Sequence, residues 1–99
     1  MRRPMSLESI EAVIVAEKAA SLGIAGRRLE RALKLLREAD EATREARLAE
    51  AAELTWNFLT QREVIGLRDR DQVIAEFDIP AEVLARVGAF RRKPVAPPA

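Results

Sequence analysis

The feature that most constrains the fold is a long stretch without helix-breaking residues. Residues 27–65 contain neither glycine nor proline, and helices usually end at such residues. A continuous helix over these 39 residues would be about 58 Å long, whereas a compact 100-residue domain has a radius of gyration of about 13 Å. The sequence therefore predicts either a long helix that protrudes and packs on a second copy, or a break near Asp40 in a monomeric bundle. We expect the continuous helix.

A narrow row of small and apolar residues runs along this stretch at alternating steps of four and three. Such spacing places the residues on one side of a helix and suits close packing against another helix. We therefore predict a homodimer interface at Leu29, Ala32, Leu36, Ala39, Thr43 and Ala46. Charged residues separate the apolar rows, and we expect helical ion pairs of Arg37 with Glu41, Asp40 with Arg44, and Arg47 with Glu50.

The remaining pattern predicts an all-α, four-helix protein, expected to form an oligomeric helical bundle. A first helix begins near an N-cap at Ser6, carries an apolar row at Leu7, Ile10, Val13 and Ile14, and ends at a turn over residues 23–26. The long helix then covers about 26–65 and ends at Gly66. Two short helices follow, 70–77 after an Asp69 cap and another from Pro80 to Gly88. We expect one domain, 1–90, with a disordered basic and proline-rich tail at 91–99.

Composition argues against several classes of protein. The chain has no cysteine and no histidine, so it lacks the usual thiolate and imidazole groups of metal sites and of nucleophilic or acid–base catalysis. We expect no enzyme activity, no cofactor and no metal. A net charge of +1 argues against bulk attraction to nucleic acid. The longest apolar run, residues 12–16, is too short to span a membrane, and we expect a cytoplasmic protein.

One polar segment, residues 56–71, is a candidate small-ligand site. It contains the single tryptophan and several charged side chains near a helix end, namely Trp56, Arg62, Glu63, Arg68 and Asp69. An arginine in this group would hold a carboxylate or phosphate through two hydrogen bonds. In the alternative interpretation, which we favour, Trp56 belongs to the core, Arg62 and Glu63 form a solvated or ion-paired helix face, and Asp69 only caps a helix.

The two short helices also have the spacing of a degenerate helix-turn-helix over residues 70–88. Apolar residues stand where that motif needs them, at Val73, Phe77, Ile79, Leu84 and Val87. The outer face of the second helix, however, carries mainly alanine and glutamate, which supply few donors to bases or phosphates. We therefore consider nucleic-acid binding an alternative and not the leading function.

Two blocks of the chain, residues 28–33 and 56–88, carry a family resemblance. Their motif residues are Arg28, Leu29, Glu30, Ala32, Leu33, Trp56, Gln61, Arg62, Glu63, Gly66, Leu67, Arg68, Asp69, Val73, Ile74, Pro80, Gly88 and the run 82–86. These blocks resemble a family of small all-helical bacterial proteins of unknown function. The resemblance implies an all-helical fold and assigns no activity and no catalytic residue.

Taken together, the pattern predicts an interaction module that associates with itself through the first helix and the row of small residues. Association with a second copy would add apolar contacts to a core that is thin at this chain length. The partner we expect is a second copy, with an unidentified protein as the alternative partner.

Overall fold

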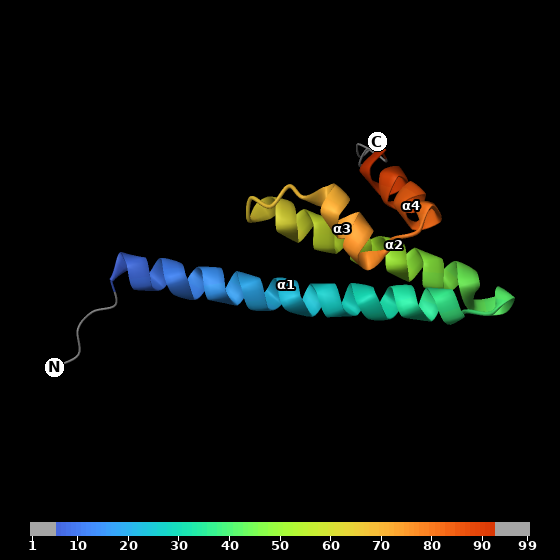
Figure 1. Cartoon of the computed structure of the whole chain (residues 1–99), viewed down its shortest axis with the longest axis horizontal. Coiled ribbons are helices and arrows are strands. Elements are labelled where there is room, and N and C mark those ends of the chain that lie inside the picture. Colours follow the sequence, from blue (N-terminus) through green and yellow to red (C-terminus); the bar gives the residue numbers. More distant parts are fainter. Residues whose placement is uncertain (1–5, 93–99) are drawn as a thin grey trace, which may run out of the picture.

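The computed structural model describes the backbone of residues 6–92 and the side chains of residues 6–89. This part contains four helices and no strand: α1 (Leu7–Glu38), α2 (Glu41–Val64), α3 (Arg70–Phe77) and α4 (Ala81–Arg92) (Figure 1). The predicted all-α class and the number of helices are confirmed. The two long helices form an antiparallel hairpin, and α3 and α4 lie along α2. No helix in residues 6–92 has the length and apolar character needed to cross a membrane.

The prediction of one continuous helix over about 26–65 is wrong, because the chain turns back at Ala39 and Asp40. Both residues have extended backbone angles, with ψ of 141° and 176°. The Asp40 carboxylate accepts hydrogen bonds from the Thr43 N–H at 2.9 Å and from the Thr43 hydroxyl at 2.8 Å. This is an N-cap, which satisfies a backbone donor at the start of α2. A capping aspartate thus starts a new helix without glycine or proline.

The predicted turn over residues 23–26 is also wrong, because α1 continues through both glycines. Gly26 is buried, and a Cβ atom placed on it would lie 3.2 Å from Cε1 of Phe58 and 3.7 Å from Cζ of Phe77. The missing side chain therefore lets the two aromatic rings approach α1. Those rings are themselves in contact, with centroids 5.2 Å apart. Gly26 thus serves packing between α1, α2 and α3.

The core lies between α1 and α2 and continues under α3 and α4. Its residues come from all four helices and mostly match the apolar rows read from the sequence. The buried apolar residues are Leu29, Ala32, Leu33, Leu36, Leu48, Ala51, Ala52, Phe58, Leu59, Val73, Ile79, Val83 and Val87. Among the described residues, one polar side chain is buried with this core. It belongs to Thr55, whose hydroxyl donates to the Ala51 carbonyl at 2.7 Å. Each helix therefore contributes to one continuous core.

The turns that follow α2 and α3 lie where the sequence predicted these helices to end. Gly66 has φ of +90° and follows the last turn of α2, where the Leu67 N–H donates to the Arg62 carbonyl at 2.8 Å. Asp78 adopts the left-handed conformation, with φ of 51° and ψ of 54°, at the end of α3. Arg37 of α1 donates to the carbonyl oxygens of Phe77 and Asp78 at 3.1 and 2.9 Å. This arginine therefore fastens the α3–α4 turn to α1.

At the two ends of the described chain, the predicted start of the first helix is confirmed and the predicted end of the last helix is wrong. The N-cap at Ser6 is confirmed, since its hydroxyl accepts a hydrogen bond from the Ser9 N–H at 3.1 Å. The last helix does not end at Gly88 but continues to Arg92, so the first two residues of the predicted tail are helical. Residues 1–5 and 93–99, including the rest of that tail, lie outside the described residues.

Candidate functional site

The first half of α1 has no buried residue and borders α2 only at its end, where Lys18 and Ser21 line a pocket with residues 60, 61, 64 and 65. Every residue from Ser6 to Ser21 is exposed, and this segment extends beyond the end of the α1–α2 hairpin (Figure 1). We call residues 7–21 the N-terminal arm. The chain is elongated for its size, with extents of 63 × 40 × 23 Å and a radius of gyration of 17.4 Å, compared with about 13 Å for a compact domain of this length.

The N-terminal arm carries a row of large apolar side chains in contact with solvent. Ile10, Val13 and Ile14 are 41%, 45% and 44% exposed, Leu7 is 71% exposed, and Ile24 continues the row at 45%. At 3.6 residues per turn, this row lies about a quarter turn around α1 from the stripe that packs on α2. A longer α2 would therefore leave much of the row uncovered. Contiguous exposed apolar surface of this kind is typical of an interaction site.

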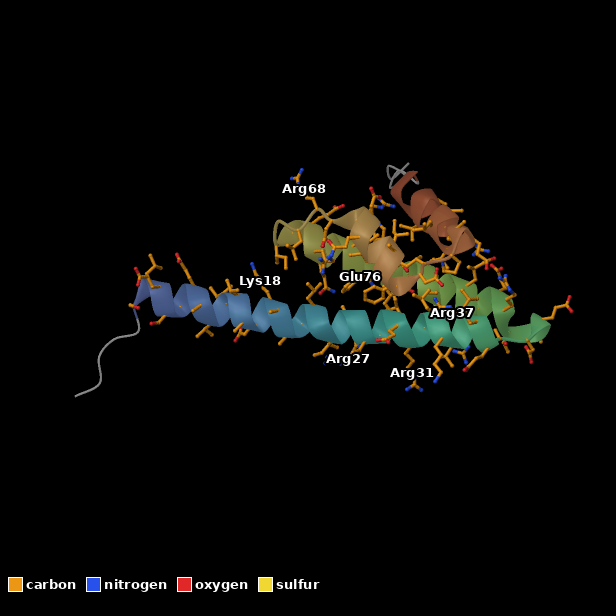
Figure 2. The ribbon with its side chains drawn as sticks, in the orientation of Figure 1. Lys18, Arg27, Arg31, Arg37, Arg68 and Glu76 are labelled. Atoms are coloured by element: carbon orange, nitrogen blue, oxygen red, sulfur yellow. The ribbon has the colours of Figure 1, made fainter. Side chains whose placement is uncertain are left out.

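Charge is distributed unevenly along α1. The arm contains three glutamates, Glu8, Glu11 and Glu17, and one lysine, Lys18. Residues 22–38 carry five basic side chains and two acidic ones. Figure 2 shows Arg27 and Arg31, two of these basic residues, on the side of α1 turned away from α2. One helix therefore has an acidic first half and a basic second half.

The row of small residues predicted as a dimer interface is used mainly inside the chain. Leu29, Ala32 and Leu36 are 0%, 2% and 5% exposed and belong to the core against α2. Ala39 is half-buried at the break. The last two residues of that prediction are exposed, and one of them, Thr43, takes part in the α2 cap; the other is Ala46. The exposed apolar row on the arm belongs to the first helix, through which the sequence analysis also predicted self-association, although its residues were not among those named for the interface.

A shallow groove adjoins this row where the arm meets the hairpin. It has a volume of about 280 Å³ and is lined by Ser21, Ile24, Ala25 and Arg28 of α1 and by Leu54, Asn57 and Gln61 of α2. The groove places Leu54, a half-buried apolar side chain, beside the exposed Ile24. The interaction surface on α1 therefore extends toward α2 at this point.

Four of the five residues proposed for ligand binding do come together. Arg62, Glu63, Arg68 and Asp69 line one pocket of about 280 Å³ between the end of α2 and the start of α3, together with Leu59, Leu67 and Arg70. Trp56 is not part of this pocket; it is 38% exposed elsewhere on α2. Figure 2 shows the Arg68 side chain directed away from the helices.

Arg62 and Asp69 form an ion pair with two hydrogen bonds. Arg62 Nε donates to Asp69 Oδ1 at 3.0 Å, and Nη2 donates to Oδ2. The guanidinium carbon also lies 5.6 Å from the Phe58 ring centroid. The hydrogen bond from Arg62 lowers the pKa of the Asp69 carboxyl from its ordinary value of 3.8, although burial acts in the opposite direction. This pair closes the α2–α3 loop, and Asp69 makes no side-chain cap to α3.

Two ion pairs join α2 to α4, and one of them contains Arg44, which we expected to pair with Asp40. Arg44 pairs with Glu82, and Arg86 pairs with Glu45; the hydrogen bond with Glu82 raises the pKa of Arg44. Of the three expected helical pairs, Arg47 with Glu50 is present, at 3.3 Å. Because Arg86 and Glu82 are engaged with α2, the geometry gives no added support to a nucleic-acid-binding face on α4.

Comparisons with known proteins identify a family but supply no activity. No curated protein and no solved structure is significantly similar to the chain. The model of a family of unknown function, DUF6665, matches residues 1–95, which includes both blocks of the resemblance and the whole of α1. The chain therefore belongs to the DUF6665 family, whose function is unknown.

Proposed function

We propose that the protein is a self-associating interaction module without catalytic activity, and that two copies join through the N-terminal arm. The observation that carries this proposal is the arm itself: 15 residues of helix, all exposed, with a row of large apolar side chains. Isolated helices of about 12–15 residues are marginal in water, so contact with another surface would stabilise this one.

A second copy of the chain complements this surface better than a partner that is only acidic or only basic. An acidic first half and a basic second half make α1 complementary to another α1. The apolar row supplies the main gain, because burying one large aliphatic side chain contributes about 1.5–3 kcal/mol. The chain has no cysteine, which fits a reducing compartment, and we propose a cytoplasmic location.

The proposal is tested by the molar mass of the full chain in solution. Sedimentation equilibrium or light scattering at micromolar concentrations should give a dimer. Replacing two residues of the apolar row, in the variant Ile10→Glu/Ile14→Glu, should give a monomer that keeps the folded hairpin, because neither side chain belongs to the core.

The matched control places the same two charges on another side of the same helix. Ala12 and Ala16 are exposed and lie more than a quarter turn from the apolar row, so Ala12→Glu/Ala16→Glu should remain a dimer. A wild-type chain that stays monomeric at about 100 μM, a concentration at which even a weak dimer is populated, would contradict the proposal.

A second candidate function is binding of a small anion at the pocket between α2 and α3. The observation in its favour is that three arginines, Arg62, Arg68 and Arg70, line one pocket. Arg62 is engaged with Asp69, so Arg68 and Arg70 would provide the contacts. Inorganic phosphate should then raise the melting temperature of the wild type and not of Arg68→Ala; equal shifts in both would contradict this function.

A further inference from the structure

We propose that the two copies lie antiparallel along α1, with Glu17 of each copy opposite Arg28 of the other. This inference rests on the proposed self-association and adds the orientation and register of the pair. A second periodic row runs along α1, distinct from the row that packs on α2.

This row, which we call the outer seam, occupies positions 7, 10, 14, 17, 21, 24, 28, 31, 35 and 38. The steps alternate three and four over the whole of α1, which is the seven-residue repeat of helices that pair along their length. Its apolar members are Leu7, Ile10, Ile14, Ile24 and Leu35. All positions of the seam are exposed except Leu35, which is half-buried.

No other described helix covers the outer seam. The seam lies about a quarter turn or more from the α2-facing stripe, and Figure 2 shows Arg31, one of its members, directed away from α2. Arg37, on another side of α1, holds the α3–α4 turn. A second helix along the seam would therefore displace neither α2 nor α3.

The charges of the seam distinguish the two orientations. In a parallel pair every residue meets its own copy, so Glu17 faces Glu17, Arg28 faces Arg28, and Arg31 faces Arg31. In an antiparallel pair whose facing residue numbers add up to 45, Glu17 faces Arg28 twice and Ile10 faces Leu35 twice. Like charges directly opposed weaken an interface and opposite charges fix its register, so the antiparallel pair is favoured.

The same charges select one antiparallel register. A shift of seven residues in one direction places Glu17 opposite Ser21, and a shift in the other direction places it opposite Leu35. Of these three registers, only the one with Glu17 facing Arg28 pairs opposite charges on the seam. Its two-fold axis falls between residues 22 and 23, beside the groove lined by Ser21, Ile24 and Leu54. Ser21 and Ile24 of the two copies would meet there, where the surface is hollowed.

Charge reversal tests the register. Glu17→Arg and Arg28→Glu should each raise the dimer dissociation constant by about tenfold or more, because each replaces two ion pairs by two repulsive contacts. The double variant Glu17→Arg/Arg28→Glu should recover the wild-type constant within about threefold, since it restores both pairs in reversed order. Glu30→Arg is the matched control, because Glu30 is exposed and lies about half a turn around α1 from Arg28.

Cross-linking tests the orientation, and the cysteine-free chain provides a clean background. In the antiparallel pair, chains carrying Ile10→Cys and Leu35→Cys should form a disulfide only when mixed, because two copies of the same position stand about 38 Å apart along the axis. Self-linking of Ile10→Cys, or a double charge reversal that stays weak, would overturn this inference while leaving self-association intact. A monomeric wild type would overturn both.

Discussion

At the scale of single residues, the two glycines of α1 have different roles although they lie in the same helix. Gly26 is buried where Phe58 approaches α1, whereas the nearest atom to a Cβ on Gly23 is the end of the flexible Arg27 side chain, at 3.6 Å. Glycine inside a helix costs about 1 kcal/mol relative to alanine. Of the two glycines, only Gly26 allows a packing contact that offsets this cost.

Substitution of the two glycines should therefore give opposite results. Gly23→Ala should raise the free energy of unfolding by about 0.5–1 kcal/mol through helix propensity alone. Gly26→Val should lower it by about 1–3 kcal/mol, because the added methyl groups meet the Phe58 ring. Urea unfolding followed by circular dichroism measures both. Equal stabilisation by the two substitutions would contradict the packing role of Gly26.

The lowered pKa of Asp69 predicts a specific loss of stability in acid. Since the folded chain binds this proton less readily than the unfolded chain, the stabilisation is complete above the unfolded pKa of about 3.9 and is lost as the pH falls through the lowered pKa of the folded state. Between about pH 5 and pH 2, the free energy of unfolding should therefore fall less steeply in Asp69→Asn than in the wild type. Asp71→Asn controls for loss of one carboxylate, and identical slopes for Asp69→Asn and the wild type would count against the ion pair.

At the scale of helices, local signals predicted the number of helices better than their caps and boundaries. The cap at Ser6 and the stops at Gly66 and Asp78 were readable because each depends on one residue and its neighbours. The break near Asp40 was the alternative that we did not favour, because residues 27–65 contain no glycine or proline and the Asp40 carboxylate was assigned to an ion pair with Arg44. Its true partner, Thr43, stands three residues on, and aspartate followed by threonine at that spacing is itself an N-cap pattern.

The docking of α4 on α2 combines buried valines with exposed ion pairs, and the valines should dominate. Val83 is fully buried, so Val83→Ala should lower the free energy of unfolding by about 1–3 kcal/mol. Glu82→Gln should have a much smaller effect, because both partners of the Arg44–Glu82 pair are over 40% exposed. Denaturant titration of the two variants measures the difference, and a larger loss in Glu82→Gln would show that the ion pairs hold α4.

At the scale of the whole molecule, the sequence predicted a helix too long for one copy to cover. The described chain does contain an uncovered helical segment, but it is not the predicted one. The break at Asp40 folds residues 25–36 onto α2, so half of the predicted interface, namely Leu29, Ala32 and Leu36, became core. α1 continues through Gly23 and Gly26, where we had predicted a turn. The segment that other helices leave uncovered is therefore residues 7–21. Sequence patterns give the apolar rows of a helix, but only the path of the chain decides which row its own residues cover.

The exposed arm gives the molecule two regions of different stability, which hydrogen exchange can separate. Residues 11–21 are all exposed, so the amides of this stretch should exchange through local fraying in a monomer, whereas those of residues 51–59, in the core, should exchange through global unfolding. In a dimer the arm gains protection by mass action. Protection of residues 11–21 should therefore rise with protein concentration in the wild type and stay low in Ile10→Glu/Ile14→Glu. Residues 51–59 provide the internal control, because their protection measures the folded hairpin in both proteins; arm protection that is independent of concentration and unchanged in the variant would mean that the arm is stable without a partner.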